Sequence, residues 1–321
     1  MRATVLGAGI SGLTTALRLL EAGWDVQVVS ADPPESTTSA LAAAIWFPTH
    51  VGPPERVNAW GRTTYDTFAA QALSAHVPGV VMRDSLVLGR APLGEPAWVA
   101  SVGPVSPAAP GDLPPGYSHG LRFVVPLVEM PVYLPWLADQ ADHAGVRFVT
   151  RRVGSLDELL DDGVDGAEVP DAVVNCSGLA ARSLVGDLSV YPVRGQIVRV
   201  SNPGLSVSVR DEHHPEGRAY VHPRATDCIL GGTLDEHEWS TEVDPAVAES
   251  ILRRCTDIVP ALTEATVLEH VVGLRPGRPT VRLEEDTSYG GRARVVHNYG
   301  HGGAGVTLSW GCADEVAALL G

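Results

Sequence analysis

The stretch Ala3-Thr-Val-Leu-Gly-Ala-Gly-Ile-Ser-Gly12 joins a short apolar strand to a glycine-rich turn. A helix-like segment follows from Leu13 to Ala22, then Gly23 as a stop, then a second apolar strand from Asp25 to Val29. This succession predicts a βαβ unit, in which two parallel strands are connected by a helix. The unit decides the fold class as α/β.

Each glycine in the turn has a separate physical role. Gly7 permits the tight turn out of the strand, Gly9 lets a pyrophosphate approach backbone N–H groups, and Gly12 lets the helix lie close to the sheet. The positive end of the helix dipole then faces the phosphates. Asp32 stands twenty residues after Gly12, in the region where a carboxylate accepts hydrogen bonds from an adenosine ribose. The motif predicts a dinucleotide site but does not distinguish FAD from NAD.

Length and charge limit the classes of partner. The 321 residues suffice for a sizeable core and two structural lobes. Asp and Glu number 38 against 23 Lys and Arg, a net charge of -15, which argues against nucleic acid and anionic membranes as partners. No stretch reaches the roughly eighteen apolar residues that span a bilayer, and the apolar N-terminus resembles a buried strand more than a signal peptide. We expect a cytoplasmic protein.

The four cysteines give no sign of a metal site. Cys176, Cys228, Cys255 and Cys312 are scattered, without a CxxC pair or the spacing of metal ligands. The sequence also lacks HExxH, GxSxG, kinase and P-loop signatures. We therefore predict reduced, mostly buried thiols and no metal.

A second glycine-rich turn lies near the end of the chain. Gly300, Gly302, Gly303 and Gly305 precede the apolar, helix-like segment Trp310 to Leu320. Backbone N–H groups at a helix start stabilise negative charge, and glycines leave room for a flat ring; the alternative is a hairpin tip. Two such turns favour FAD over NAD, because a large cofactor has two ends to be held.

Two further stretches contain candidate ligand-binding side chains. Gly273 to Pro279 places Arg275 and Arg278 among prolines, and a guanidinium can clamp a carboxylate through two hydrogen bonds. Each arginine taken alone also fits an ordinary surface position. Tyr220 follows the polar loop Arg210 to Gly217 and fits either a hydroxyl donor or a core residue.

The chain resembles the D-amino-acid oxidase family, and the resemblance extends over nearly its whole length in the family's order. The matching stretches are Gly7–Gly12, Ala42–Trp46, Val174–Gly178, Val193–Gln196, Gly231–Thr233, Gly273–Pro276 with Arg278–Pro279, and Val296–Gly303 with Trp310–Cys312. The resemblance implies a Rossmann-like FAD-binding domain formed by residues 1–46, 132–190 and 273–321. It also implies an α+β substrate-binding domain with a mainly antiparallel sheet, formed by residues 47–131 and 191–272.

The resemblance assigns roles by position. Arg275 resembles the arginine that clamps the substrate carboxylate, Tyr220 the tyrosine whose hydroxyl adds a hydrogen bond, and Gly303 the glycine whose carbonyl holds the amino group. Ile45, Tyr220 and Arg275 would line the substrate pocket. The implied cofactor positions are Gly7, Ala8, Gly9, Ile10, Ser11, Gly12, Asp32, Thr38, Ser39, Ala43, Ala44, Val153, Ser177, Gly178, Gly300, His301, Gly302, Gly303, Ala304, Gly305, Val306 and Thr307.

The implied reaction is the oxidation of a D-amino acid by O2, with hydride transfer from Cα to N5 of non-covalently bound FAD. Water then hydrolyses the imino acid to a 2-oxo acid and ammonia. The reduced flavin passes two electrons to O2, which gives hydrogen peroxide. Glycine or sarcosine oxidase, D-aspartate oxidase and a flavoprotein dehydrogenase that does not use O2 are the alternatives. The sequence leaves the oligomeric state, a homodimer included, and the physiological pathway open.

One position, that of Leu234, indicates which substrate side chains the protein prefers. Leu234 comes directly after Gly231–Thr233, where an arginine would suit a D-aspartate oxidase. We therefore expect neutral or apolar D-amino acids, with Arg210, Arg218 and Arg224 as the cations that could still reach the pocket.

The chain departs from the family pattern at several positions. Ala44 stands where eukaryotic members commonly have glycine, and Ala304 where they have tyrosine. The loop at 210–217 is shorter than the mammalian lid and has Glu216 where a second tyrosine is expected. A shorter lid should let products leave faster.

Overall fold

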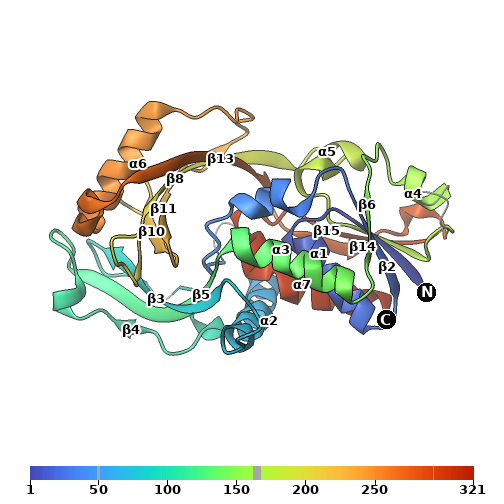
Figure 1. Ribbon diagram of the computed structural model, residues 1–321, viewed down its shortest axis with the longest axis horizontal. Helices are drawn as coiled ribbons and strands as arrows, with labels where there is room; N and C mark the ends of the chain where they lie inside the picture. Colours follow the sequence, from blue (N-terminus) through green and yellow to red (C-terminus); the bar gives the residue numbers. More distant parts are fainter. Residues whose placement is uncertain (49–50, 95, 162–167, 292) are drawn as a thin grey trace.

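The computed structural model describes residues 1–48, 51–94, 96–161, 168–291 and 293–321. These residues form two sheets, one in each half of an elongated molecule, and both termini lie in the same half (Figure 1). Each sheet has its own cluster of buried apolar side chains. Among the described helices, none combines the length and apolarity needed to cross a membrane.

The first sheet confirms the predicted βαβ unit. Its strand order is β14-β15-β7-β1-β2-β6, and every neighbouring pair is parallel except β14 with β15. The strands are β1 (Arg2–Leu6), β2 (Asp25–Ser30), β6 (Arg147–Thr150), β7 (Ala172–Asn175), β14 (Arg282–Glu285) and β15 (Arg294–Tyr299). Strands β1, β2 and β7 are almost wholly buried, as their nearly continuous apolar sequences require in a parallel sheet.

Two long helices pack against the first sheet, and two more pack against these helices (Figure 1). Helix α1 (Ile10–Glu21) contacts both α3 (Met130–His143) and α7 (Gly305–Leu320), and α7 contacts α2 (Pro54–Ala72). A Cβ built on Gly311 of α7 would lie 2.3 Å from the backbone oxygen of Trp60 in α2. Only glycine allows these two helices to approach so closely.

The second sheet is mainly antiparallel, as the sequence predicts. Its order is β12-β8-β11-β10-β9-β3-β5-β4, with β13 on the other edge of β8 and one parallel pair, β3 with β9. The strands are β3 (Val80–Gly89), β4 (Ser106–Pro107), β5 (His119–Val128), β8 (Tyr191–Ser201), β9 (Ser208–Asp211), β10 (Ala219–Pro223), β11 (Asp227–Gly231), β12 (Asp235–Glu236) and β13 (Val267–Gly277). Helix α6 (Pro245–Ile258) packs against this sheet through its buried apolar face.

Short helices fill the connections. They are α4 (Asp157–Asp161), α5 (Ala181–Leu184), η1 (Pro34–Ser36), η2 (Thr38–Leu41), η3 (Val99–Ser101), η4 (Pro110–Asp112), η5 (Gly178–Ala180), η6 (Pro260–Glu264), η7 (Thr287–Tyr289) and η8 (Gly302–Ala304). The η prefix marks 3-10 helices, which serve as connectors in short pieces.

Strands β8 and β13 form a long ribbon that joins the two halves (Figure 1). Their pairing runs from Val200 with Val267 to Tyr191 with Gly277. The boundary expected between residues 272 and 273 therefore falls inside a strand. Because of this continuity, the end of β13 that carries Arg275 reaches the first half, where β13 contacts η5 and η8.

Candidate active site

A cavity of about 700 Å³ is lined by residues of both halves. On the first half, the lining comes from segments that directly follow the parallel strands β1, β2, β6 and β7. These segments are 6–11, 30–32, 151–154 and 176–180. In a doubly wound sheet, ligands bind outside the carboxyl ends of the strands, and the cavity lies at this edge.

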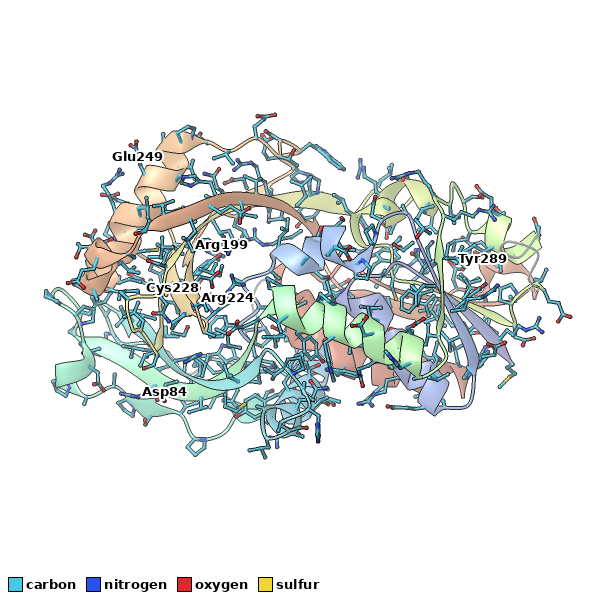
Figure 2. The ribbon with its side chains drawn as sticks, in the orientation of Figure 1. Asp84, Arg199, Arg224, Cys228, Glu249 and Tyr289 are labelled. Atoms are coloured by element: carbon cyan, nitrogen blue, oxygen red, sulfur yellow. The ribbon has the colours of Figure 1, made fainter. Side chains whose placement is uncertain are left out.

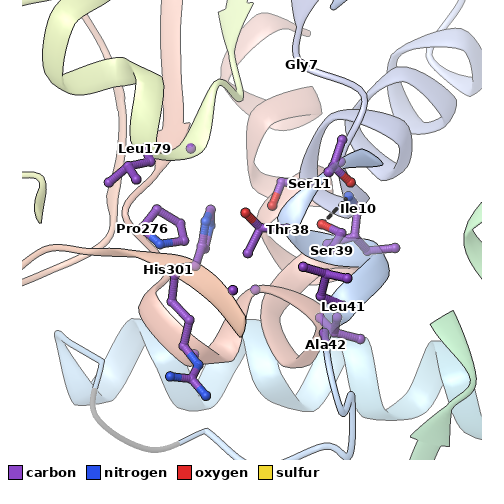
Figure 3. Close-up of a pocket in the computed structure, with 18 of the residues that line it drawn as sticks. Gly7, Ile10, Ser11, Thr38, Ser39, Leu41, Ala42, Leu179, Pro276 and His301 are labelled. Carbon is purple, nitrogen blue, oxygen red and sulfur yellow. Dashed lines mark hydrogen bonds between the residues drawn. The ribbon is translucent and has the colours of Figure 1, made fainter. Parts of the chain in front are cut away.

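The start of α1 provides an anion-binding surface in this cavity. Gly7 has φ +113°, and a Cβ there would lie 2.6 Å from the Cys176 carbonyl oxygen, so the turn requires glycine. The backbone N–H of Ile10 donates to Ser39 Oγ at 3.0 Å, as the dashed line in Figure 3 shows. Asp32 lines the same cavity. A helix start, a close backbone approach and a carboxylate together fit a dinucleotide.

The start of α7 borders the cavity as well. Gly302, Gly303 and Gly305 line it, with His301 beside Pro276 in Figure 3. His301 is 3% exposed, and its Nε2 has no hydrogen-bond partner among the described residues. Burial lowers the pKa of His301 to about 4, so the imidazole is neutral at pH 7. An orphaned ring nitrogen beside a second helix start fits a polar cofactor edge.

A partly buried network holds the second turn in place. Asp187 Oδ2 accepts from Tyr299 Oη at 2.9 Å and from Arg278 Nε at 3.0 Å. Burial alone would raise the pKa of Asp187, but hydrogen bonds, led by that from Ser189, lower it to about 2. Arg278 is thus committed to Asp187, and it is not among the residues that line the cavity. Of the two arginines in the proline-rich segment, only Arg275 lines the cavity.

The three residues with implied catalytic roles lie together. Arg275 on β13 donates from Nη1 to the Thr233 carbonyl at 3.1 Å, and a Cβ on Gly303 would lie 3.5 Å from its Cδ. Tyr220 on β10 lines the same cavity. Burial raises the pKa of the Tyr220 phenol, against the opposing effect of the nearby Arg275. The phenol is therefore a proton donor beside a cation.

Two glycines make room for these side chains. A Cβ on Gly195 would lie 2.2 Å from Arg275 Nη1, and a Cβ on Gly231 would lie 2.1 Å from Tyr220 Cζ. No real Cβ occupies such positions, so a side chain at either glycine would displace the functional group. The resemblance motifs Val193–Gln196 and Gly231–Thr233 thus act as supports for Arg275 and Tyr220.

The backbone conformation of Ala44 bears on one departure from the family pattern. Its φ is +52°, a left-handed conformation that glycine adopts without strain and alanine does not. Its carbonyl accepts from Val128 N at 2.9 Å, and neighbouring Ile45 forms a bridge with Leu127. The second sheet therefore holds this segment in the conformation for which glycine is common in the family.

Most of the expected positions line the cavity, and three lie behind its wall. Gly12, Gly300 and Ala304 are absent from the lining. A Cβ on Gly12 would lie 1.9 Å from Gly7 O, one on Gly300 would lie 2.9 Å from Arg278 Cβ, and Ala304 belongs to the core. These three residues support the cavity through packing.

Sequence reasoning missed several lining residues. Arg151 and Arg152 follow β6 and could have been found from the rule that ligands lie at carboxyl strand ends. Phe47 and His222 carried no such signal. His222 stacks on Tyr220 with ring centroids 4.7 Å apart, and Ser208 Oγ lies 2.7 Å from its Nδ1.

The three candidate cations separate into two groups. Arg210 and Arg218 line the cavity. Arg224 is wrong as a pocket residue, because its guanidinium is paired with Asp227 at 2.5 Å and borders a second cavity of about 240 Å³. Figure 2 labels Arg224 near Arg199 in the second half, and Arg199 also pairs with Asp227.

The burial of His222 should make the free energy of unfolding depend on pH. Burial lowers its pKa from 6.5 to about 3 in the folded protein. Below pH 6.5 the unfolded chain takes up a proton that the folded protein does not, so stability present above pH 6.5 is lost as pH falls toward 3. His222→Gln should lose less stability than wild type between pH 7 and 5, by about 2 kcal/mol. Urea unfolding at both pH values measures this; equal losses in both proteins would contradict it.

Comparison with known proteins matches the site. A family model described as FAD dependent oxidoreductase covers residues 2–319. The chain belongs to this family. D-Amino-acid oxidase of Rubrobacter xylanophilus is 51% identical over all of this chain and 96% of the relative. D-Amino-acid oxidase of Streptomyces coelicolor is 43% identical over 98% of this chain and 95% of the relative. These relatives confirm the resemblance found in the motifs.

A more distant relative and a solved structure extend the comparison. Human D-aspartate oxidase is 35% identical over 99% of this chain and 94% of the relative. The structure of a glycine oxidase from Geobacillus kaustophilus superposes with a TM-score of 0.82, covering 99% of this chain and 94% of that chain at 21% identity. The predicted fold class is confirmed.

The site of this FAD-dependent oxidoreductase fits its cofactor. Two helix starts border one cavity, Asp32 lies at the end of β2, and the buried His301 Nε2 lacks a partner among the described residues. A cofactor with phosphates and a polar ring would satisfy all three features. In the described residues, no group of three or more His, Cys, Asp or Glu could hold a metal ion.

Proposed function

We propose that this protein is a D-amino-acid oxidase that acts on neutral or apolar D-amino acids. One molecule of D-amino acid and one of O2 give the imino acid and hydrogen peroxide, and water converts the imino acid to a 2-oxo acid and ammonia. The proposal rests on one observation above the others: Arg275, Tyr220 and Gly303 meet in a cavity that also contains the dinucleotide motif. The relatives named D-amino-acid oxidase support it.

The protein's own residues bind and orient the substrate. The Arg275 guanidinium clamps the carboxylate, and the Tyr220 hydroxyl donates a further hydrogen bond to it. The Gly303 carbonyl accepts from the substrate amino group. Three contacts to two substituents orient the substrate, so that the single hydrogen on its Cα points toward the cofactor side of the cavity. FAD, when bound, supplies the two-electron acceptor.

Several apolar side chains line the cavity beside these contacts. Ile45, Phe47, Ile197 and Leu234 line the cavity. Apolar walls favour an uncharged side chain and limit water around the reacting carbon. The position of Leu234 supports the preference for neutral or apolar D-amino acids.

We further propose that FAD is held without a covalent bond. Cys176 is the cysteine in the cavity lining, and burial raises the pKa of its thiol to about 12, so the reactive thiolate is not formed near pH 7. Acid precipitation should release the yellow flavin into the supernatant. Colour that remains in a washed pellet would contradict non-covalent binding.

The proposal includes a cytoplasmic location and a homodimer as the assembly to test. All four cysteines are free and buried, which suits a reducing compartment. Analytical ultracentrifugation of the FAD-loaded protein measures the assembly directly.

The test of the proposed function compares electron acceptors and substrates. Oxygen uptake is measured with D-valine, D-methionine, glycine and sarcosine, beside reduction of an artificial quinone without O2. The proposal predicts uptake of one O2 for each D-valine oxidised and much slower uptake with sarcosine. Quinone reduction without oxygen uptake would show a dehydrogenase, and faster turnover of sarcosine would show a sarcosine oxidase.

A further inference from the structure

Arg254 of α6 is a buried cation that lies behind the cavity wall. It is 4% exposed and is absent from the cavity lining. Its guanidinium donates from Nε to the carbonyl of Arg218, from Nη2 to the carbonyl of Gly232 at 3.1 Å, and from Nη1 to Ser250 Oγ at 2.9 Å. All three acceptors are neutral oxygen atoms. Burial lowers the pKa of this guanidinium, because neutral acceptors only partly replace the water that a charge loses.

The two carbonyl groups belong to the ends of the two strands that position Tyr220. Arg218 directly precedes β10, which contains Tyr220, and Gly232 directly follows β11. Tyr220 is paired with Gly231 in the ladder of β10 and β11. The guanidinium of α6 therefore connects both strands beside this pair. The neighbouring Cys255 adds a second contact from α6, because its Sγ donates to the Tyr220 carbonyl at 3.3 Å.

The Tyr220 ring packs directly on the backbone that Arg254 holds. A Cβ built on Gly232 would lie 2.6 Å from Tyr220 Oη, and one built on Gly231 would lie 2.1 Å from Tyr220 Cζ. The hydroxyl end of the ring thus lies against these two glycines, and its position depends on where their backbone lies. Arg254 fixes that backbone through the Gly232 carbonyl.

We propose that Arg254 is a positioning residue for the Tyr220 hydroxyl, and that it acts on the substrate carboxylate through the Gly232 backbone. This inference rests on the proposed function and extends it to a residue without substrate contact. A guanidinium suits the role, because its N–H groups diverge in one rigid plane and can bind two carbonyl groups at once. A methionine would fill a similar volume but leave both carbonyl groups without their charged donor.

The first experiment is a double-mutant cycle between Arg254→Met and Tyr220→Phe on the FAD-loaded protein. Arg254→Met should lower kcat/KM for D-valine about tenfold, mainly through KM, because the hydrogen bond from the hydroxyl to the carboxylate is misaligned. In the Tyr220→Phe background, which lacks that hydroxyl, the same substitution should lower kcat/KM by less than about twofold. A purely structural role would give equal losses in both backgrounds. Equal losses, or no loss in either background, would overturn the proposal.

Two further variants separate this role from general damage to α6. Arg253→Met changes the neighbouring residue, whose side chain is 59% exposed, and should alter kcat/KM by less than about twofold. A loss as large as that in Arg254→Met would overturn the proposal. Arg254→Lys keeps the charge but donates from a single nitrogen, so it should fall between wild type and Arg254→Met. If circular dichroism shows that Arg254→Met does not fold, Arg254→Lys takes its place in the cycle, with the same dependence on Tyr220 expected.

A binding measurement tests the role without turnover. Butyrate has one carboxylate and no amino group, and it is titrated against the flavin absorbance of the four proteins of the cycle. Arg254→Met should weaken butyrate binding about tenfold in the wild-type background and by less than about twofold in Tyr220→Phe. Unchanged binding in Arg254→Met, or no binding to the wild-type protein, would overturn the role. If no D-amino acid is oxidised, the proposed function fails, while this titration still decides whether Arg254 acts through Tyr220.

Discussion

Arg275→Leu is expected to lower kcat/KM for D-valine by about two to four orders of magnitude. The guanidinium is the cation that lies beside Tyr220 and Gly303, and its loss would leave the substrate carboxylate without its charged partner and the substrate free to rotate. The variant should bind FAD normally, because the expected cofactor positions are unchanged. Oxygen uptake and flavin absorbance, measured on the same preparation, separate the two effects.

Two companion variants sharpen this prediction. Arg275→Lys keeps the charge but loses the planar pair of donors, so it should fall between wild type and Arg275→Leu. Gly195→Ala leaves Arg275 in the chain but places a Cβ where Nη1 now lies, 2.2 Å away. It should therefore impair turnover as well. Near-normal kcat/KM in Arg275→Leu would remove Arg275 from the active site.

Gly9→Val is expected to weaken FAD binding about a hundredfold. A Cβ at Gly9 would already lie 3.0 Å from Ser39 Oγ, the atom that accepts from Ile10 N at the start of α1. The two further methyl groups of valine would extend into the cavity where a pyrophosphate approaches the backbone. Titration of the apoprotein with FAD, followed by flavin fluorescence, gives the dissociation constant.

Gly111→Val is the matched control for this change. Gly111 lies in η4, and a Cβ there would meet no atom within 4 Å. The same substitution should leave FAD affinity unaltered, while circular dichroism checks that both variants are folded. Wild-type affinity in Gly9→Val would show that the glycine-rich turn does not hold the cofactor.

Local patterns predicted the first half of the fold well. The βαβ unit depends on neighbouring residues, since the glycine spacing and the apolar runs lie within thirty residues of each other. The strand β13 carried no such signal, because Gly273, Pro276 and Gly277 are residues that usually interrupt strands. Its strand conformation comes from pairing with β8, which is distant in sequence. The parallel pairing of β3 with β9 likewise depends on tertiary contacts.

In the candidate site, too, some residues could be predicted from local patterns, whereas the roles of others depend on tertiary contacts. Motif positions such as Gly7 and Gly12 could be predicted because their backbone conformation or close approach restricts the residue type. The state of Arg210 could not, because a single arginine in a polar loop gives no indication of burial. The pairing of β9 with β10 and the ring of Phe47 create that burial. The commitment of Arg278 to Asp187 depends on a contact between segments 91 residues apart.

The most direct test of the central claim is a peroxide-coupled assay of the purified, FAD-loaded protein with matched D- and L-amino acids. Three contacts, from Arg275, Tyr220 and Gly303, define a chiral site, so only one enantiomer can present its Cα–H to the cofactor. The account predicts hydrogen peroxide from D-amino acids, D-valine and D-methionine included, and none from their L-enantiomers. Peroxide from the L-enantiomers, or none from any amino acid despite bound flavin, would contradict it.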